Sequence, residues 1–133
     1  MEHNFKIEIV SPEKIIFSTE DITEVTLPSY EGEMGILKDH IPLISFLKPG
    51  IIRVFKLNDN INNFFVQTGI AEFYNNNLTI LSSEIINLKD LKKEKIDQLI
   101  IESEKILNDQ KINDDVKYLT IHKINTLKSL NLN

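Results

Sequence analysis

The chain has 133 residues, of which 41% are hydrophobic and 26% are charged, a composition typical of a folded domain with an ordinary core. It contains no cysteine, which excludes a disulfide framework and any thiolate metal site. The formal net charge of −5 argues against general nucleic-acid binding, which needs clustered lysine and arginine. No apolar run approaches the roughly 18 residues that span a bilayer, and the N-terminus lacks the features of a secretory signal. We therefore expect the chain in the cytosol or at the periphery of a membrane complex.

The first part of the chain has the alternating pattern of short, half-buried strands. Apolar and polar residues alternate over residues 5–9 and again over residues 23–27. Two further pairs of strands flank asparagine-rich turns, residues 51–57 with 64–67 and residues 70–74 with 78–81. Asparagine and aspartate tolerate left-handed backbone conformations, so both turns predict hairpins. Short strands with frequent turns favour a β-sandwich or a barrel.

Residues 27–43 are unusually dense in residues that constrain the backbone. Two glycines, two prolines and one histidine fall within these 17 residues. This density predicts an irregular path rather than a plain strand or helix.

The second part of the chain predicts two helices. Every glycine and proline lies within the first 69 residues, and helix interiors exclude both. Apolar residues recur at helical spacings over residues 88–107, and residues 108–111 then break the pattern. Asp114 or Asp115 is the expected cap of the next helix. The predicted fold class is α+β, with a β-sandwich at residues 1–84 followed by an antiparallel two-helix hairpin at residues 85–133.

In the second predicted helix an apolar residue recurs at every third position, at Tyr118, Ile121, Ile124, Leu127 and Leu130. Three residues turn a helix by about 300°, so this stripe winds around the helix and cannot be buried by one neighbouring helix. Either the helix is wedged between its partner helix and the sandwich, or it sometimes leaves and docks elsewhere. Residues 1–84 carry 12 acids and 6 bases, whereas residues 85–133 carry 8 acids and 9 bases. This asymmetry is either ordinary variation or a sign that the C-terminal segment meets an acidic partner.

The residues that carry chemistry do not form a recognisable catalytic or metal-binding motif. The three histidines are far apart in sequence, and no zinc-binding spacing or phosphate-binding glycine loop is present. Glu31 and Glu33 flank a glycine, where carboxylates are either solvated or in contact with a partner. His40 is either a loop anchor that bonds a nearby backbone carbonyl or an interface contact. We therefore expect no enzyme activity, no metal and no cofactor, and we favour a binding or regulatory role.

Several motifs resemble those of one family, the epsilon subunit of F-type ATP synthases. Residues 5–13 resemble the family's opening strand and its V-S-P-E turn. Residues 31–43 resemble its E-G-[DE]-[LMF]-G-[IV]-L…H-x-P-L signature, although Lys38-Asp39 stands where many members have Pro-Gly. Residues 48–54, 65–73 and 76–81 resemble three further strand motifs, and all of these motifs occur in the family's order.

The resemblance implies a non-catalytic rotor subunit that couples proton-driven rotation to ATP synthesis. It implies contacts with the gamma subunit, the ring of c subunits and the alpha and beta subunits, and no nucleic acid. The implied location is the cytoplasmic face of the bacterial inner membrane, where the subunit is peripheral. By position in the family's loops, Glu31, Glu33 and His40 would contact partners, the c ring above all. Backbone shaping would fall to Gly32, Gly35, Pro42 and Pro49.

In many bacterial members of this family the hairpin extends along the gamma subunit and inhibits ATP hydrolysis. On that pattern, the candidate inhibitory contacts are Lys111, Lys117, Lys123 and Lys128. Some members bind ATP through an I-D-x-x-R-A motif. Here Asp97 is retained but Ile100 replaces the arginine, so we expect no nucleotide binding or only weak binding. Two alternatives remain: a free-standing β-sandwich module that holds another protein, and a hydrolase that uses Glu31, Glu33 and His40.

Overall fold

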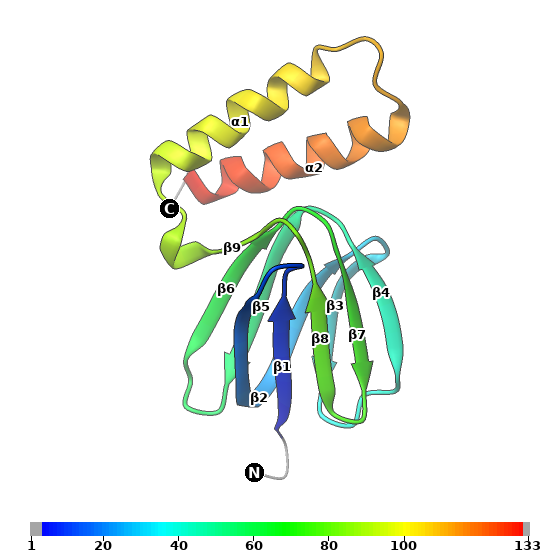
Figure 1. The fold of residues 1–133 in the computed structure, drawn as a ribbon, viewed down its shortest axis with the longest axis vertical. Helices are drawn as coiled ribbons and strands as arrows, with labels where there is room; N and C mark the ends of the chain where they lie inside the picture. Colours follow the sequence, from blue (N-terminus) through cyan, green and yellow to red (C-terminus); the bar gives the residue numbers. More distant parts are fainter. Residues whose placement is uncertain (1–3, 132–133) are drawn as a thin grey trace.

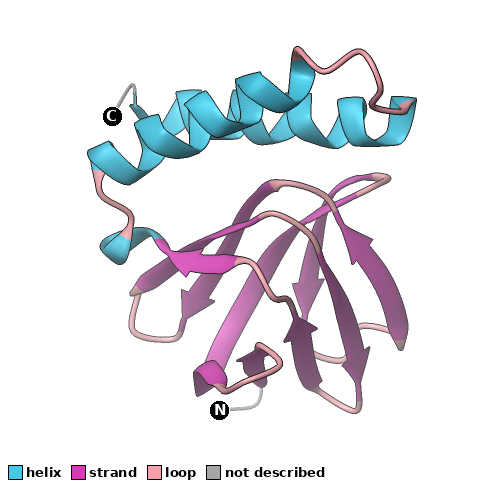
Figure 2. Cartoon of the chain, turned by 45° about the horizontal axis from the view of Figure 1, so that its top comes forward, coloured by secondary structure: helices cyan, strands magenta, loops and turns pink. Residues whose placement is uncertain are grey.

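The computed structural model describes residues 4–131 of the chain. These residues form a β-sandwich with a helical hairpin across one end, shown in Figures 1 and 2. The strands are β1 (Phe5–Val10), β2 (Ile15–Ser29), β3 (Gly32–Leu37), β4 (Leu43–Leu47), β5 (Gly50–Lys56), β6 (Ile61–Val66), β7 (Gly69–Tyr74), β8 (Asn77–Leu81) and β9 (Ile85–Asn87). A 3₁₀ turn (Leu88–Asp90) leads into α1 (Lys93–Leu107) and α2 (Asp114–Asn131). The predicted α+β class, a sandwich followed by two helices, is confirmed.

The long strand β2 joins the two layers of the sandwich. Its first half pairs antiparallel with β1, and its second half pairs with β3 and β5. Asp21 has a φ of 62°, and the β2–β5 register shifts between Ile22 and Glu24, so the strand bends where it passes from one layer to the other. Alternation alone predicted only residues 23–27 of this strand, because the polar and apolar residues before the bend do not alternate cleanly.

The prediction of an irregular path for residues 27–43 is wrong for most of that segment. β2 continues to Ser29, and β3 pairs with it from Gly32 opposite Ser29 to Leu37 opposite Glu24. A tight turn at Tyr30 and Glu31 joins them. The irregular part is the loop between β3 and β4, where Asp39 has a φ of 64°. The Asp39 backbone N–H donates to the Asn76 side-chain oxygen at 2.7 Å, which ties this loop to the β7–β8 turn.

The core lies between the two layers and is built from alternate residues of most strands. The fully enclosed side chains include Ile7, Ile9, Val25, Leu27, Ile52 and Val54. Phe5 packs edge-on against Phe73 within the same core. Burial of each large apolar side chain stabilises the fold by about 1.5–3 kcal/mol, so the sandwich holds a filled interior of its own.

The helical hairpin covers the outer face of β5, β6 and β9. On that face Ile51, Phe65 and Ile86 lie opposite one another in a single row across the three strands. Phe65 packs in one apolar cluster with Leu91, Ile96, Ile100 and Leu127, all from the helical segment. Strand β9 continues the sheet for three residues past residue 84. The connection to the helices therefore begins later than residue 85, where the sequence predicted that the helical part starts.

The helix ends differ from the sequence prediction in two places. The first helix begins at Lys93 rather than at residue 88, because Asn87 caps a 3₁₀ turn by accepting a hydrogen bond from the Lys89 N–H at 3.0 Å. Asn113, not Asp114 or Asp115, caps α2: its side-chain oxygen accepts from the Val116 N–H at 2.8 Å. The two aspartates lie in the first turn, where their charge complements the helix dipole.

The winding stripe of α2 contacts more than one neighbour. Ile124 and Leu127 are buried, and Leu130 packs against the apolar cluster of the hairpin. Tyr118 and Ile121 remain largely exposed. In this structure the helix therefore lies between α1 and the sandwich, as the first of the two interpretations has it.

Gly50 occupies a position where the chain has no room for a side chain. A Cβ atom added at Gly50 would lie 2.5 Å from the Pro28 Cβ, on a neighbouring strand. We expect Gly50→Ala to lower the free energy of unfolding by about 1–3 kcal/mol, because the strands must move apart. Urea denaturation measures this loss. Gly35→Ala is the matched control, since its Cβ would meet only the tip of the Glu24 side chain, at 3.3 Å. Equal urea midpoints for both variants would contradict the prediction.

Candidate protein-docking surfaces

The outer face of β4, β7 and β8 is apolar and lies open to solvent. Phe46, Ile70 and Leu81 lie opposite one another in a row across the three strands. Ile44 and Tyr74 extend this surface, and the five residues are between 39% and 67% exposed. Glu72, which lies opposite Ile44, adds a carboxylate to the surface. We use the name apolar face for the five apolar residues, which are Ile44, Phe46, Ile70, Tyr74 and Leu81. Contiguous exposed apolar surface of this kind marks a site of protein contact.

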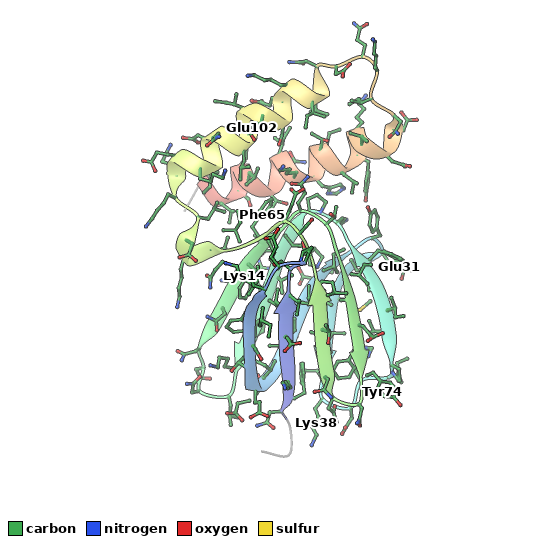
Figure 3. All side chains as sticks on the ribbon, viewed as in Figure 1. Lys14, Glu31, Lys38, Phe65, Tyr74 and Glu102 are labelled. Carbon is green, nitrogen blue, oxygen red and sulfur yellow. The ribbon has the colours of Figure 1, made fainter. Side chains whose placement is uncertain are left out.

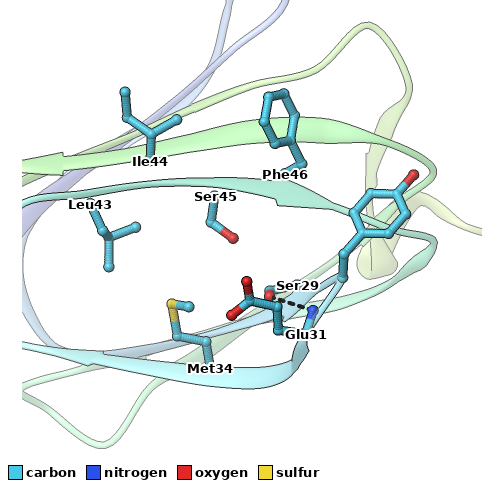
Figure 4. A pocket seen from close by; sticks show the side chains of 8 residues that line it. Ser29, Glu31, Met34, Leu43, Ile44, Ser45 and Phe46 are labelled. Carbon is cyan, nitrogen blue, oxygen red and sulfur yellow. Dashed lines mark hydrogen bonds between the residues drawn. The ribbon is translucent and has the colours of Figure 1, made fainter.

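A groove borders the apolar face where the sandwich is open between β3 and β4 (Figure 4). Strand β3 pairs with β2, and β4 pairs with β7 and meets β2 at one position, Ser29 opposite Leu47. The groove has a volume of about 530 Å³, and its lining residues are Ser29, Tyr30, Glu31, Met34, Leu43, Ile44, Ser45 and Phe46. Because Ile44 and Phe46 belong to both surfaces, the groove and the apolar face form one continuous region.

The structure places the three predicted partner contacts in two separate regions. Glu31 lies in the β2–β3 turn on the side of the sandwich that carries the helices, and Lys38, at the end of β3, lies at the far end (Figure 3). Glu33 is exposed on β3, and its carboxylate is 3.7 Å from the Arg53 guanidinium. His40 follows in the β3–β4 loop, so β3 separates it from Glu31.

His40 makes local contacts within the β3–β4 loop. Its Nδ1 lies 2.8 Å from the Ile41 carbonyl oxygen, and its ring lies edge-on to Phe73 at 6.0 Å between centroids. These contacts are those of a loop anchor. They also place the histidine beside β7, whose residue Tyr74 belongs to the apolar face. The interface role of His40 stays a prediction.

The residues predicted to shape loops occupy different surroundings. Gly32 has a φ of 122°, a conformation that residues with a side chain rarely adopt. Gly35 lies within β3 with an ordinary φ, Pro42 is exposed, and Pro49 is buried in the β4–β5 turn. The sequence reasoning did not single out Gly50 or Gly69, where an added Cβ would approach neighbouring atoms closely. The residue pattern gives no signal for such contacts, because the atoms involved belong to strands distant in sequence.

The four candidate inhibitory lysines differ in how they are held. Lys111 and Lys117 are exposed, and the Lys128 ammonium is 3.9 Å from the Glu104 carboxylate. The Lys123 ammonium donates to the Gln67 side-chain oxygen at 2.7 Å, across the seam between α2 and the sandwich. Burial lowers the pKa of Lys123, although the nearby acids Glu84 and Glu102 act in the opposite direction.

Asp97 and Ile100, on the first helix, are both engaged in holding the hairpin together. The Asp97 carboxylate accepts from the Lys93 ammonium at 3.1 Å and from the Asn131 side-chain N–H at 2.9 Å. These two hydrogen bonds, that of Lys93 first, lower the pKa of Asp97. Ile100 is buried in the apolar cluster with Phe65 and Leu127. Its side chain offers no donor and points into packed surface, which suits no phosphate group.

Other classes of site find no support in residues 4–131. In that range no group of three histidine, aspartate or glutamate side chains could hold a metal ion. The same range contains no helix with the length and hydropathy required to cross a membrane.

Comparison with known proteins assigns the chain to a family. The model of the beta-sandwich domain of the ATP synthase delta/epsilon chain matches residues 4–88. The chain belongs to this family. Its sequence is 53% identical to an ATP synthase epsilon chain of Pelagibacter ubique (strain HTCC1062) over 131 residues, covering 98% of this chain and 100% of the relative. An ATP synthase epsilon chain of Parvibaculum lavamentivorans is 35% identical, with 98% of this chain and 97% of that chain covered. The resemblance seen in the sequence is confirmed.

A solved structure shares the fold of this epsilon-family chain. A chain in the mitochondrial ATP synthase of Euglena gracilis, described with its OSCP, F1 and c-ring parts, superposes with a TM-score of 0.77 at 19% identity. The match covers 96% of this chain and 81% of that chain. The likeness extends over both the sandwich and the helical hairpin.

The surroundings of Ile100 predict that this family member does not bind ATP with micromolar affinity. Each missing charge-assisted hydrogen bond to phosphate would cost about 1.5–3 kcal/mol. Calorimetric titration of the full chain with MgATP should show no saturable heat in the micromolar range. A family member that carries the arginine is the positive control. Micromolar affinity in this chain would contradict the prediction.

Proposed function

We propose that this epsilon chain is a non-catalytic rotor subunit of the central stalk, which couples proton-driven rotation to ATP synthesis. The observation that carries the proposal is the apolar face, an open surface of five large side chains on a sandwich whose own core is already filled. Such a surface serves association rather than folding. Family membership and the lack of a metal-binding cluster within residues 4–131 support a role in assembly rather than in chemistry.

The proposed occupant of the apolar face is the gamma subunit. Phe46 lies opposite Ile70 in the row that continues to Leu81, and its large exposed ring is the best candidate for an anchor that fills a pocket on the partner. Glu72 would meet a cationic or hydrogen-bonding group of gamma, because a carboxylate enclosed by an interface must be paired. The β3–β4 loop borders this region, because Pro42 lines a hollow together with Ile44 and Tyr74, so we assign His40 of the same loop to the gamma contact as well.

The proposed contact with the c ring uses Glu31 and Glu33. Both carboxylates are exposed, and both lie at or near the β2–β3 turn, well separated from His40. We assign the ring contact to these two carboxylates and the His40 contact to gamma, because β3 separates Glu31 from the loop that holds His40. Contact with the ring would place the chain at the cytoplasmic face of the bacterial inner membrane as a peripheral component. The bacterial origin of its relatives supports this location.

Phe46→Glu should disrupt the complex with gamma. Burial of a phenylalanine contributes about 1.5–3 kcal/mol, so its replacement by a charge should weaken association at least about tenfold. Co-expression with gamma, followed by affinity purification through this chain, measures the effect. The matched control is Ile61→Glu, which changes an exposed apolar residue on β6, in the other layer. Equal recovery of gamma with both variants would contradict this assignment of the face. Failure of the unaltered chain to recover gamma would favour the free-standing binding module.

The hairpin supplies the proposed regulatory part of the function. We propose that it leaves the sandwich, extends along gamma, and inhibits ATP hydrolysis through lysine contacts with acidic surface on the beta subunits. Lys111 and Lys117 are exposed in the docked hairpin and are available for such contacts. Lys123 and Lys128 would first have to give up Gln67 and Glu104. Residues 85–133 carry 9 bases against 8 acids, so the hairpin holds the cations that an acidic partner surface would meet after release.

Neutralising Lys111 and Lys117 should relieve this inhibition. Exposed charge pairs contribute roughly 0.2–1 kcal/mol each, so the double substitution to glutamine should raise ATP hydrolysis by the assembled enzyme roughly two- to thirtyfold. The steady-state hydrolysis rate of the purified complex measures this change. Lys14→Gln with Lys56→Gln removes the same charge from the sandwich and should leave the rate unchanged. A rate for the hairpin variant equal to that of the control would remove these lysines from the proposal.

A further inference from the structure

An aromatic cluster joins the second helix to two turns of the sandwich. The Tyr118 ring of α2 stacks on Tyr30 of the β2–β3 turn, with 6.5 Å between centroids and 17° between planes. The Lys48 ammonium, from the β4–β5 turn, lies 6.0 Å from the centre of the same ring. His122, one helical turn further along α2, lies edge-on to Tyr118 at 4.4 Å. We call Tyr30, Lys48, Tyr118 and His122 the latch.

The latch and the apolar cluster hold the hairpin in chemically different ways. The cluster around Phe65 is apolar and joins residues of both helices to β6. The latch is formed by aromatic rings and an ammonium group. Between them Lys123 bonds Gln67, next to a small cavity of about 50 Å³ that Pro49, Ser103 and Thr120 help to line. The contact between α2 and the sandwich is therefore polar on the latch side. A change of charge on that side has the strongest effect on docking of the hairpin.

His122 brings a titratable group to this seam. The cation nearest to it across the seam is Lys48 of the sandwich: the Lys48 ammonium lies 6.0 Å and the His122 ring 4.4 Å from the centre of the same Tyr118 ring. Within residues 4–131 no carboxylate forms an ion pair with His122, and the acids of the seam, Glu84 and Glu102, act on the neighbouring Lys123. An imidazolium at His122 would thus face an ammonium without a compensating negative charge.

The contact between His122 and Tyr118 does not offset this repulsion. The two residues are four positions apart on one helix, so their rings remain neighbours whether the hairpin is docked or released. Any attraction between the imidazolium and the Tyr118 ring is therefore present in both states and cancels from the docking equilibrium. The interactions that depend on docking are the partial burial of the imidazole and the position of Lys48 at the Tyr118 ring, and both disfavour the charged ring.

We propose that protonation of His122 loosens the latch and favours release of the hairpin from the sandwich. Docking of the hairpin is then sensitive to pH in the range where histidine titrates. The inference rests on the proposed function for its biological meaning, as a control on the inhibitory state, but its test needs only the isolated chain. An acidic cytosol would shift the population toward the released hairpin.

The direction of the pH effect follows from proton linkage. Burial, and then the charge of Lys48, lowers the pKa of His122 in the docked state below its usual value of 6.5. Docking therefore favours the neutral ring. The docked state has its full stability above the pKa of the released histidine. This stability declines as the pH falls through that value toward the lower pKa of the docked histidine. Each unit of difference between the two pKa values changes the docking constant about tenfold.

The test follows separation of the hairpin from the sandwich in the full chain. Because the chain has no cysteine, Lys14→Cys and Gln110→Cys introduce a unique pair of sites for fluorescent dyes, one on the sandwich and one on the hairpin loop. Energy transfer between the dyes is recorded in urea titrations at pH 8 and pH 5. We expect transfer to be lost at a lower urea concentration at pH 5. We expect His122→Gln to reduce that shift, because the glutamine carries no charge at either pH.

Lys48→Gln and Lys56→Gln form a matched pair of controls. Both remove one cation from the sandwich, but Lys56 lies on β5 outside the latch. Lys48→Gln should reduce the pH shift, and Lys56→Gln should leave it as in the unaltered chain. A pH shift in His122→Gln equal to that of the unaltered chain, or no shift in the unaltered chain, would overturn the proposal. Neither result would bear on binding of gamma or on hydrolysis by the assembled enzyme, which test the proposed function separately.

Discussion

The architecture depends on the need to bury two apolar outer faces of one sandwich. The interior is filled by alternate residues of both layers, yet rows of large apolar side chains also point outward on each layer. The chain covers one of these rows, Ile51–Phe65–Ile86, with its own helical hairpin. The apolar face on β4, β7 and β8 stays open. The same constraint therefore explains why the hairpin packs where it does and why the molecule needs a partner on the other side.

The sequence predicted those parts of the fold that depend on local periodicity. Alternation in residues 5–9 and the asparagine turns located strands and hairpins, and helical spacing located both helices. It failed where tertiary contacts decide the outcome. The glycines and prolines of residues 27–43 suggested a loop, but the turn there is short, with Gly32 at its end opposite Ser29, and Pro28 fits within β2 opposite Glu33. The cap of α2 is Asn113 rather than the predicted Asp114 or Asp115, because these neighbouring polar side chains could each fill that role.

The candidate site was only partly visible in the sequence. Family motifs drew attention to Glu31, Glu33 and His40, which lie along one hairpin and its loop, but strand register separates the carboxylates from the histidine. The apolar face combines residues of β4, β7 and β8 that become neighbours only through pairing. The latch combines two turns and a helix. Neither arrangement has a signature in a single stretch of sequence.

The packing of Ile100 has a consequence for how the hairpin can respond to the cell. The buried Ile100 side chain packs only against other side chains of the protein. These contacts therefore do not respond to the concentration of a metabolite. The contribution of this position to the balance between docked and released states is then set by packing alone, while the proposed latch adds a dependence on pH. Selection can adjust that contribution through the size of one side chain.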